Sequence, residues 1–203
     1  MKIVRFLLLA GLISVSLLPQ AAGASSSAAL FLQPLLSDVD CDAVPDISGE
    51  WDIDDPSLDG PVTIQKLDSC RYRLLWPARD AESDADGFEV RIGNLDGHLF
   101  FDAISQPIRP DGKELFTNEW FWIPLHFIGR LEIERNVLHF SFVDDNWMAD
   151  SLKSGRICMN TILYLGEFVI PTASSKELKE LVTRFASDAQ TFSFEVTLER
   201  KPR

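Results

Sequence analysis

Apolar and polar residues alternate along much of the chain with a period of two. Between residues 192 and 199, four apolar side chains alternate with four polar ones, and similar runs cover residues 71–76, 88–92, 131–134 and 138–142. This alternation is typical of antiparallel strands with one buried face. Asp-Gly turn signals separate several runs, and Asp96-Gly97 between two apolar runs is the strongest hairpin signal. We predict eight or nine strands, at residues 49–54, 61–67, 71–77, 88–94, 98–104, 123–135, 137–143, 165–171 and 191–200.

Two short helices are predicted in the C-terminal half. Ser174 and Glu177 form a capping-box pattern, and an apolar stripe at helical spacing follows, which predicts a helix at about 175–187. A shorter helix begins at Asp144 or Asp145 and ends before Gly155. Many short strands with few helices predict a mainly β fold, either an antiparallel up-and-down barrel or a strongly curved sheet.

The first 24 residues have the features of a secretory signal peptide. Lys2 and Arg5 precede an uncharged apolar run at residues 6–18, and Ala22-Gly23-Ala24 is a small-residue cleavage signal. We therefore expect Ser25 to be the mature N-terminus, in the periplasm or outside the cell; an uncleaved anchor is the alternative. We divide the remainder into a flexible leader at residues 25–45 and a single β-barrel-like domain at residues 46–203.

Composition and charge narrow the class of protein. The 203 residues are 46% hydrophobic and 25% charged, which excludes wholesale disorder. Acidic residues outnumber basic ones by 31 to 19, giving a net charge of −12. This charge argues against nucleic-acid binding and against docking on anionic lipid by charge alone. No apolar stretch long enough to span a membrane follows the signal peptide.

Three cysteines are present, at positions 41, 70 and 158, without the spacing of a metal site. An exported protein can form disulfides, and three cysteines allow one internal bridge at most. We favour Cys41–Cys70, because Cys41 precedes the first strand and Cys70 lies at a predicted hairpin; either other pair, or none, remains possible.

Catalytic and cofactor motifs are not evident in the sequence. His98, His126 and His139 lack the short spacings of zinc ligands, and the acidic run at residues 82–86 lacks the twelfth-position glutamate of an EF-hand. We find no nucleophile elbow and no glycine-rich phosphate loop. The sequence therefore favours a non-enzymatic protein without a cofactor.

The most unusual run is apolar on both strand faces, at residues 120–128. Trp120 and Trp122 share one face with Pro124 and His126, whereas the opposite face is uniformly apolar. We expect the uniformly apolar face to point into the core. Trp120 or Trp122 is then predicted to be partly exposed beside a ligand or partner surface; burial under the 175–187 helix and insertion into a membrane are the alternatives.

Two resemblances bear on the fold. Gly49-Glu50-Trp51 on the first strand resembles the lipocalin and calycin families, in which the Trp closes one barrel end and a late Arg, here Arg200, packs across it. The chain also resembles a group of uncharacterised bacterial exported proteins, often lipoproteins. That second resemblance rests on the segments Tyr72-Arg73-Leu74, Leu95-Asp96-Gly97-His98-Leu99-Phe100-Phe101-Asp102, Asp145-Asn146-Trp147 and Thr172-Ala173-Ser174 with Leu178. This chain lacks the lipid-bearing Cys, and the group implies a fold and a compartment without an activity.

Three functional hypotheses follow. The first is a lipocalin-like domain that binds a small apolar ligand. The second is an acidic protein-binding module, of the inhibitor or immunity type, that meets a basic partner. The third is a hydrolase acting through acidic residues. Whether the barrel interior is open or filled is the observation that separates them best.

Overall fold

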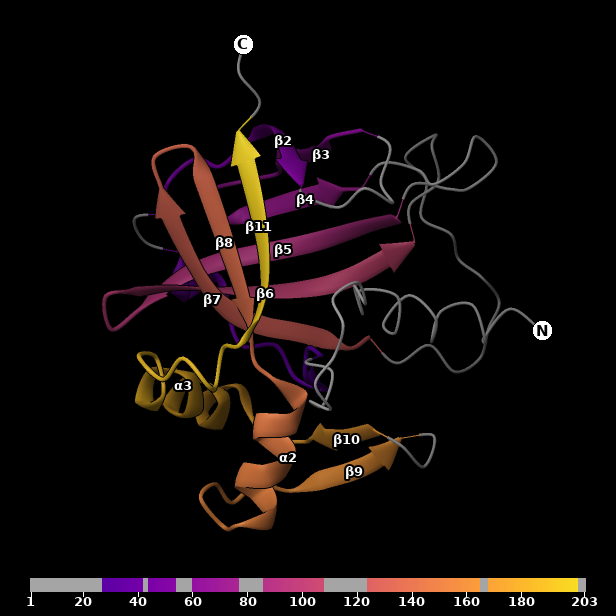
Figure 1. The fold of residues 1–203 in the computed structure, drawn as a ribbon, viewed down its shortest axis with the longest axis vertical. Helices are drawn as coiled ribbons and strands as arrows, with labels where there is room; N and C mark the ends of the chain where they lie inside the picture. Colours follow the sequence, from indigo (N-terminus) through magenta and orange to yellow (C-terminus); the bar gives the residue numbers. More distant parts are fainter. Residues whose placement is uncertain are drawn as a thin grey trace, which may run out of the picture.

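A computed structural model describes residues 27–41, 44–53, 60–76, 86–107, 124–164 and 168–200 (Figure 1). Eight antiparallel strands follow one another around a closed barrel, because the last strand pairs with both the first and the seventh. The predicted up-and-down barrel is therefore confirmed. Its strands are β2 (Gly49–Ile53), β3 (Val62–Lys66), β4 (Arg71–Leu75), β5 (Asp86–Leu95), β6 (His98–Pro107), β7 (His126–Glu134), β8 (Val137–Phe142) and β11 (Phe194–Arg200).

The two ends of the barrel differ. The tight turns β3–β4, β5–β6 and β7–β8 lie at one end, which we call the closed end, together with the last residue of β11, Arg200. Asp96 (φ 52°) and Gly97 (φ 84°) make the predicted β5–β6 turn, where two successive positive φ angles match the twist of the flanking strands. At the opposite end, which we call the open end, β4, β6 and β8 finish and β5, β7 and β11 begin.

Side chains of the barrel strands that point inward form one hydrophobic core. Trp51 lies near the closed end, and Ile64, Tyr72, Ile92 and Leu138 are among the inner side chains that are at least 98% buried. Alternation explains this core, because every second residue of each strand faces the barrel axis.

A second core covers the outer wall of β6 and β7. Helices α2 (Asp145–Lys153) and α3 (Ser175–Arg184) contribute to it, as does the short strand β1 (Leu30–Phe31). The predicted caps are present, since Asp144 accepts a hydrogen bond from the Trp147 amide and Ser174 accepts one from the Glu177 amide. The α3 helix ends at Arg184, three residues earlier than predicted at 187. Both predicted helices are thus confirmed, and they pack outside the barrel (Figure 1).

Residues 165–171 were expected to form a strand of the main sheet. The strand found there, β10 (Phe168–Pro171), instead pairs with β9 (Thr161–Tyr164) in a separate two-stranded hairpin beside α2 (Figure 1). Two further strands, β9 and β1, are four and two residues long and were not predicted. Short segments with little alternation give no periodic signal.

The parts of the predicted flexible leader that the structure describes, residues 27–41 and 44–45, pack against the barrel. Phe31 and Leu35 are 0% exposed and Leu36 is 2% exposed. The reason is that the outer wall is itself apolar at Phe100 and Ile128, and this run covers it. Residues 1–24, the predicted signal peptide, lie outside the described residues.

Candidate ligand-binding site

Five aromatic side chains line the inner wall at the open end. Phe88, Phe127, Phe142 and Phe194 occupy inward positions near the open ends of β5, β7, β8 and β11, and Trp76 directly follows β4. Neighbouring ring centroids lie 6.4, 6.1, 6.4 and 5.4 Å apart in the order Trp76, Phe88, Phe127, Phe142 and Phe194. We call this set the aromatic arc. All five side chains are only partly buried, which distinguishes them from the core below.

A filled floor lies beneath the arc. The Phe101 ring is 1% exposed and packs edge-on against Phe142 and Phe140, at centroid distances of 4.9 and 5.2 Å. Gly129 on β7 leaves room for Phe101, because a Cβ at position 129 would stand 2.6 Å from Cε1 of that ring. The inner side chains below, as far as Trp51, are close-packed. Between this floor and the closed end, the described inner side chains fill the barrel.

Two surface hollows lined by described residues, of about 350 Å³ each, lie on the outer side of the barrel. One lies beside α2, where Asp144, Trp147 and Arg156 are among its lining residues. The other lies over the outer wall near His98 and Arg130. Neither hollow reaches the aromatic arc.

The leader completes the barrel wall next to the arc. Leu30 of β1 pairs with Phe127, Ala28 bridges to Asp144, and the Ala29 amide donates a hydrogen bond of 2.8 Å to the Val143 carbonyl. β1 therefore lies between the start of β7 and the residues that follow β8. This placement shields the wall from which two members of the arc project.

Asp102 and His126 form a buried polar contact on the outer wall, under the leader. Asp102 is 5% exposed; its Oδ1 lies 2.6 Å from Nδ1 of His126, and its Oδ2 accepts the Leu35 and Leu36 amides at 2.7 and 3.3 Å. The carboxylate thus anchors the leader and orients the imidazole. Sequence reasoning missed this pair, although an Asp within the apolar run 99–104 was a visible signal.

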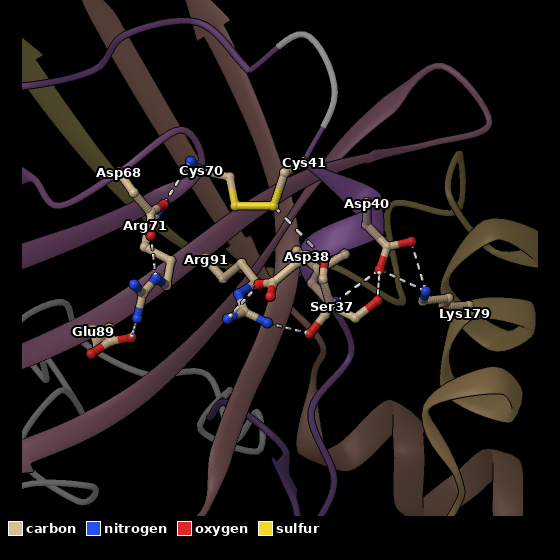
Figure 2. The surroundings of a disulfide bond; sticks show 11 residues. Ser37, Asp38, Asp40, Cys41, Asp68, Cys70, Arg71, Glu89, Arg91 and Lys179 are labelled. Atoms are coloured by element: carbon tan, nitrogen blue, oxygen red, sulfur yellow. Dashed lines mark hydrogen bonds and ion pairs between the residues drawn. A yellow bond between two sulfur atoms is a disulfide. The ribbon is translucent and has the colours of Figure 1, made fainter.

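The end of the leader is fastened at several points (Figure 2). Cys41 and Cys70 are joined by a disulfide across a sequence separation of 29 residues. Nζ of Lys179 on α3 donates to both carboxylate oxygens of Asp40 at 2.6 Å, and Arg91 on β5 pairs with Asp38 at 3.2 Å. These contacts tie the leader to the β3–β4 hairpin, to β5 and to α3.

The electrostatics of this segment follow from its contacts. Burial of Asp40 acts to raise the pKa of its carboxyl, but hydrogen bonds from Lys179 and Ser37 outweigh it and leave the pKa below the usual 3.8. On the first turn of α2, burial raises the pKa of the half-buried Asp145, and the neighbouring Asp144 carboxylate adds to the effect.

The residues chosen from the sequence are distributed as follows. Trp120 and Trp122 lie outside the described residues. Trp51 is 2% exposed at the closed end, and the Arg200 guanidinium lies 4.8 Å from its ring centroid. Gly49, at the start of the same strand, has φ 137°, a conformation that favours glycine. Cys158 is a free, exposed thiol.

Within the described ranges, three or more metal-ligating side chains do not come together at any point. His139 on β8 contacts Glu195 on β11 at 2.9 Å, whereas the Asp102–His126 pair lies on β6 and β7. Across the same ranges, no helix has the length and hydrophobicity to cross a membrane.

Comparisons with protein-family models, with curated proteins and with solved structures give no match. The barrel and the aromatic arc are therefore the basis for assigning a function.

Proposed function

We propose that this protein is a non-enzymatic, exported binding domain of lipocalin-like architecture, and that a small apolar molecule binds against the aromatic arc. The observation that carries the proposal is the partial exposure of five inward-facing aromatic side chains above a filled floor. An eight-stranded barrel has an interior that side chains can fill or that can hold one small ligand. In this barrel, side chains fill the interior toward the closed end, whereas partly exposed aromatic rings line it at the open end.

The aromatic arc has the chemistry of an apolar ligand site. Aromatic side chains give large contact areas at low cost in conformational entropy, and they favour edge-on contacts with other rings. Trp120 and Trp122 precede β7, which begins at the open end, so we retain both as further candidate contacts.

A dye titration tests this function. N-phenyl-1-naphthylamine, an uncharged dye that fluoresces in apolar surroundings, is expected to bind the purified protein with one site. Phe194→Ala should weaken this binding by about tenfold, a typical loss for a residue at the centre of an interface. Ile162→Ala is the matched control, since Ile162 is an exposed apolar residue on β9 outside the barrel and should leave dye binding unchanged. Equal affinities for all three proteins would contradict the proposal.

We propose export to the periplasm or beyond, with cleavage after Ala24. The Cys41–Cys70 disulfide supports an oxidising compartment, because such bonds are rare in the reducing cytosol. Mass spectrometry of protein recovered from the periplasmic or secreted fraction should show Ser25 at the N-terminus. An intact Met1 in that fraction would contradict the cleavage.

A second candidate function is an acidic surface for a basic protein partner. Glu199 of β11 lies directly opposite Asp52 of β2 on the outer wall, and both side chains are exposed. Like charges in register destabilise a sheet, and a basic partner would relieve the repulsion. Such a partner would bind less tightly to Asp52→Asn/Glu199→Gln and at high salt. Dye binding at the aromatic arc would respond to neither change.

A further inference from the structure

Strand β9 forms an open edge of the two-stranded hairpin. It pairs with β10 on one side, and no strand that the structure describes pairs with its other side. The outer edge of β10 is covered by the leader, since the Leu32 amide donates to the Pro171 carbonyl at 3.5 Å. β9 is therefore the outer strand of the hairpin, on the side away from the barrel (Figure 1). An edge strand with unpaired backbone groups is a template for pairing with another chain.

The register of the hairpin identifies the backbone groups on this edge. The Thr172 amide donates to the Asn160 carbonyl at 2.8 Å, so these two residues form a hydrogen-bonded pair. Such pairs alternate with non-hydrogen-bonded pairs along an antiparallel ladder. The next pair, Thr161 with Pro171, is accordingly non-hydrogen-bonded, and Pro171 has no amide to donate. The amide and carbonyl groups of Thr161 and Leu163 therefore point away from β10, toward the open edge.

The sequence along this edge is uncharged, and the exposed side chain on it is apolar. Ile162 is 40% exposed, although its cross-strand neighbour on the same face, Ile170, is 1% exposed. Edge strands are commonly protected by charged side chains or proline, and β9 contains neither. The chain as a whole has a net charge of −12, but residues 157–166 include no charged side chain. Two copies can therefore meet along β9 without placing carboxylates opposite each other.

The open edge is complementary to itself. With a two-fold axis at Ile162, Thr161 of each copy lies opposite Leu163 of the other, and these two pairs exchange hydrogen bonds through all their outward amide and carbonyl groups. Ile162 then lies opposite Ile162 of the second copy in a non-hydrogen-bonded pair, where Cα atoms are about 4.5 Å apart and side chains are in contact. We propose that a second copy of this chain docks on β9 in this register, so that a symmetric dimer joins the two hairpins into one four-stranded sheet.

The size of this contact sets the strength of the dimer. β9 has four residues, far fewer than the about 20–30 residues that each partner contributes to a standard stable interface. The dimer should therefore be reversible and should dissociate on dilution.

Sedimentation velocity over a range of protein concentrations tests the proposal. Wild-type protein should shift from monomer toward dimer as its concentration rises. Ile162→Lys places two like charges opposite each other at the axis and should weaken the dimer by about tenfold. Leu67→Lys is the matched control, because Leu67 is also 40% exposed but lies outside β9, and it should leave the dimer unchanged.

A proline variant tests the backbone hydrogen bonds. Thr161→Pro removes an amide that points to the open edge and that β10 does not use. The variant should keep the circular dichroism spectrum and melting temperature of the wild-type protein and should lose the dimer.

Disulfide cross-linking tests the register. Ile162→Cys, in a chain that also carries Cys158→Ser, should form a covalent dimer on mild oxidation, since the Cα separation at the axis suits a disulfide. The exposed Cys158 of the wild-type protein is the control. It lies four residues from the axis, which places it more than about 20 Å from Cys158 of the second copy, so wild-type protein should not cross-link.

Three results would overturn the proposal. A wild-type protein that is monomeric at every concentration would leave this edge to a strand from a different protein. Equal dimerisation of Ile162→Lys and Leu67→Lys would place the contact outside β9. Cross-linking through Cys158, with none through Ile162→Cys, would show a different register. Dye binding at the aromatic arc depends on none of these changes, so the dimer and the proposed function are tested separately.

Discussion

The closed end of the barrel provides the sharpest test of how the fold is stabilised. Trp51 is 2% exposed, its Nε1 donates to the Ile47 carbonyl at 3.0 Å, and Arg200 covers its ring. Trp51→Ala removes a fully buried aromatic side chain and should lower the free energy of unfolding by about 3–5 kcal/mol. For a domain of this size each kcal/mol corresponds to about 2–4 °C, so the melting temperature should fall by roughly 6–20 °C.

Arg200 should contribute less. Its guanidinium stacks on the indole and donates to the Ser48 carbonyl at 3.1 Å, but the residue is exposed. Arg200→Ala is expected to cost about 1 kcal/mol, since exposed cation–π contacts are weak. In a double-mutant cycle with Trp51→Ala, a coupling energy of about 0.5–1 kcal/mol should appear, because each single change already removes the stacking.

Urea denaturation followed by circular dichroism measures these changes, and Trp51→Phe is the control. That variant keeps most of the apolar contact and loses the hydrogen bond to Ile47, so it should cost about 1–2 kcal/mol. A Trp51→Ala protein with the wild-type unfolding midpoint would show that the indole does not close the barrel. Zero coupling with Arg200→Ala would show that the stacking is not energetically significant.

Three further changes probe the leader and the barrel wall. Cys70→Ser opens the 29-residue disulfide loop and should cost about 3–4 kcal/mol of stability, measured by denaturation with and without reductant. Gly129→Ala places a Cβ against the Phe101 ring and should cost about 1–3 kcal/mol, visible as a lower melting temperature. Lys179→Met removes the ion-pair partner of Asp40, a group whose pKa is lowered in the folded state. At neutral pH the wild-type protein should therefore have a free energy of unfolding about 1 kcal/mol higher than the variant. This difference in stability should disappear as the pH falls through the folded-state pKa of Asp40, which lies below 3.8. Urea unfolding midpoints of both proteins, measured from neutral pH down to below that pKa, check the prediction.

Strand positions could be predicted from the sequence because each barrel residue has only two environments, the core and the outer face. In segments such as 192–199, alternating apolar and polar residues indicate alternating core and outer positions. The structure places Phe194, Val196 and Leu198 inward, as this pattern predicts. The site was harder to predict. The phenylalanines of the arc alternate with polar residues in the same way as the buried Phe101 does. The sequence pattern therefore does not distinguish the partly exposed rings of the arc from the buried ring of the floor. Their exposure depends on the height of each residue along the barrel axis, which strand register across the whole sheet determines.

Two other features depended on long-range contacts. The apolar run at residues 30–36 resembles a leader when read alone, and it packs because Phe100 and Ile128 present an apolar outer wall to it. Asp102 is placed by the same packing, since the Leu35 and Leu36 amides reach it only when the leader crosses β6. Sequence periodicity carries no information about a segment that crosses the outside of a barrel.

The distribution of buried and exposed aromatic rings makes stability and binding separable in this fold. The closed end and the floor beneath the arc hold side chains that are almost fully buried, such as Trp51 and Phe101. Members of the aromatic arc keep part of their surface exposed, so their truncation removes less buried area than truncation of Trp51 does. A variant such as Phe194→Ala should therefore lose affinity for the dye while keeping most of its melting temperature, whereas Trp51→Ala should lose stability first. Loss of both properties together at Phe194 would mean that the arc belongs to the core and not to a ligand site.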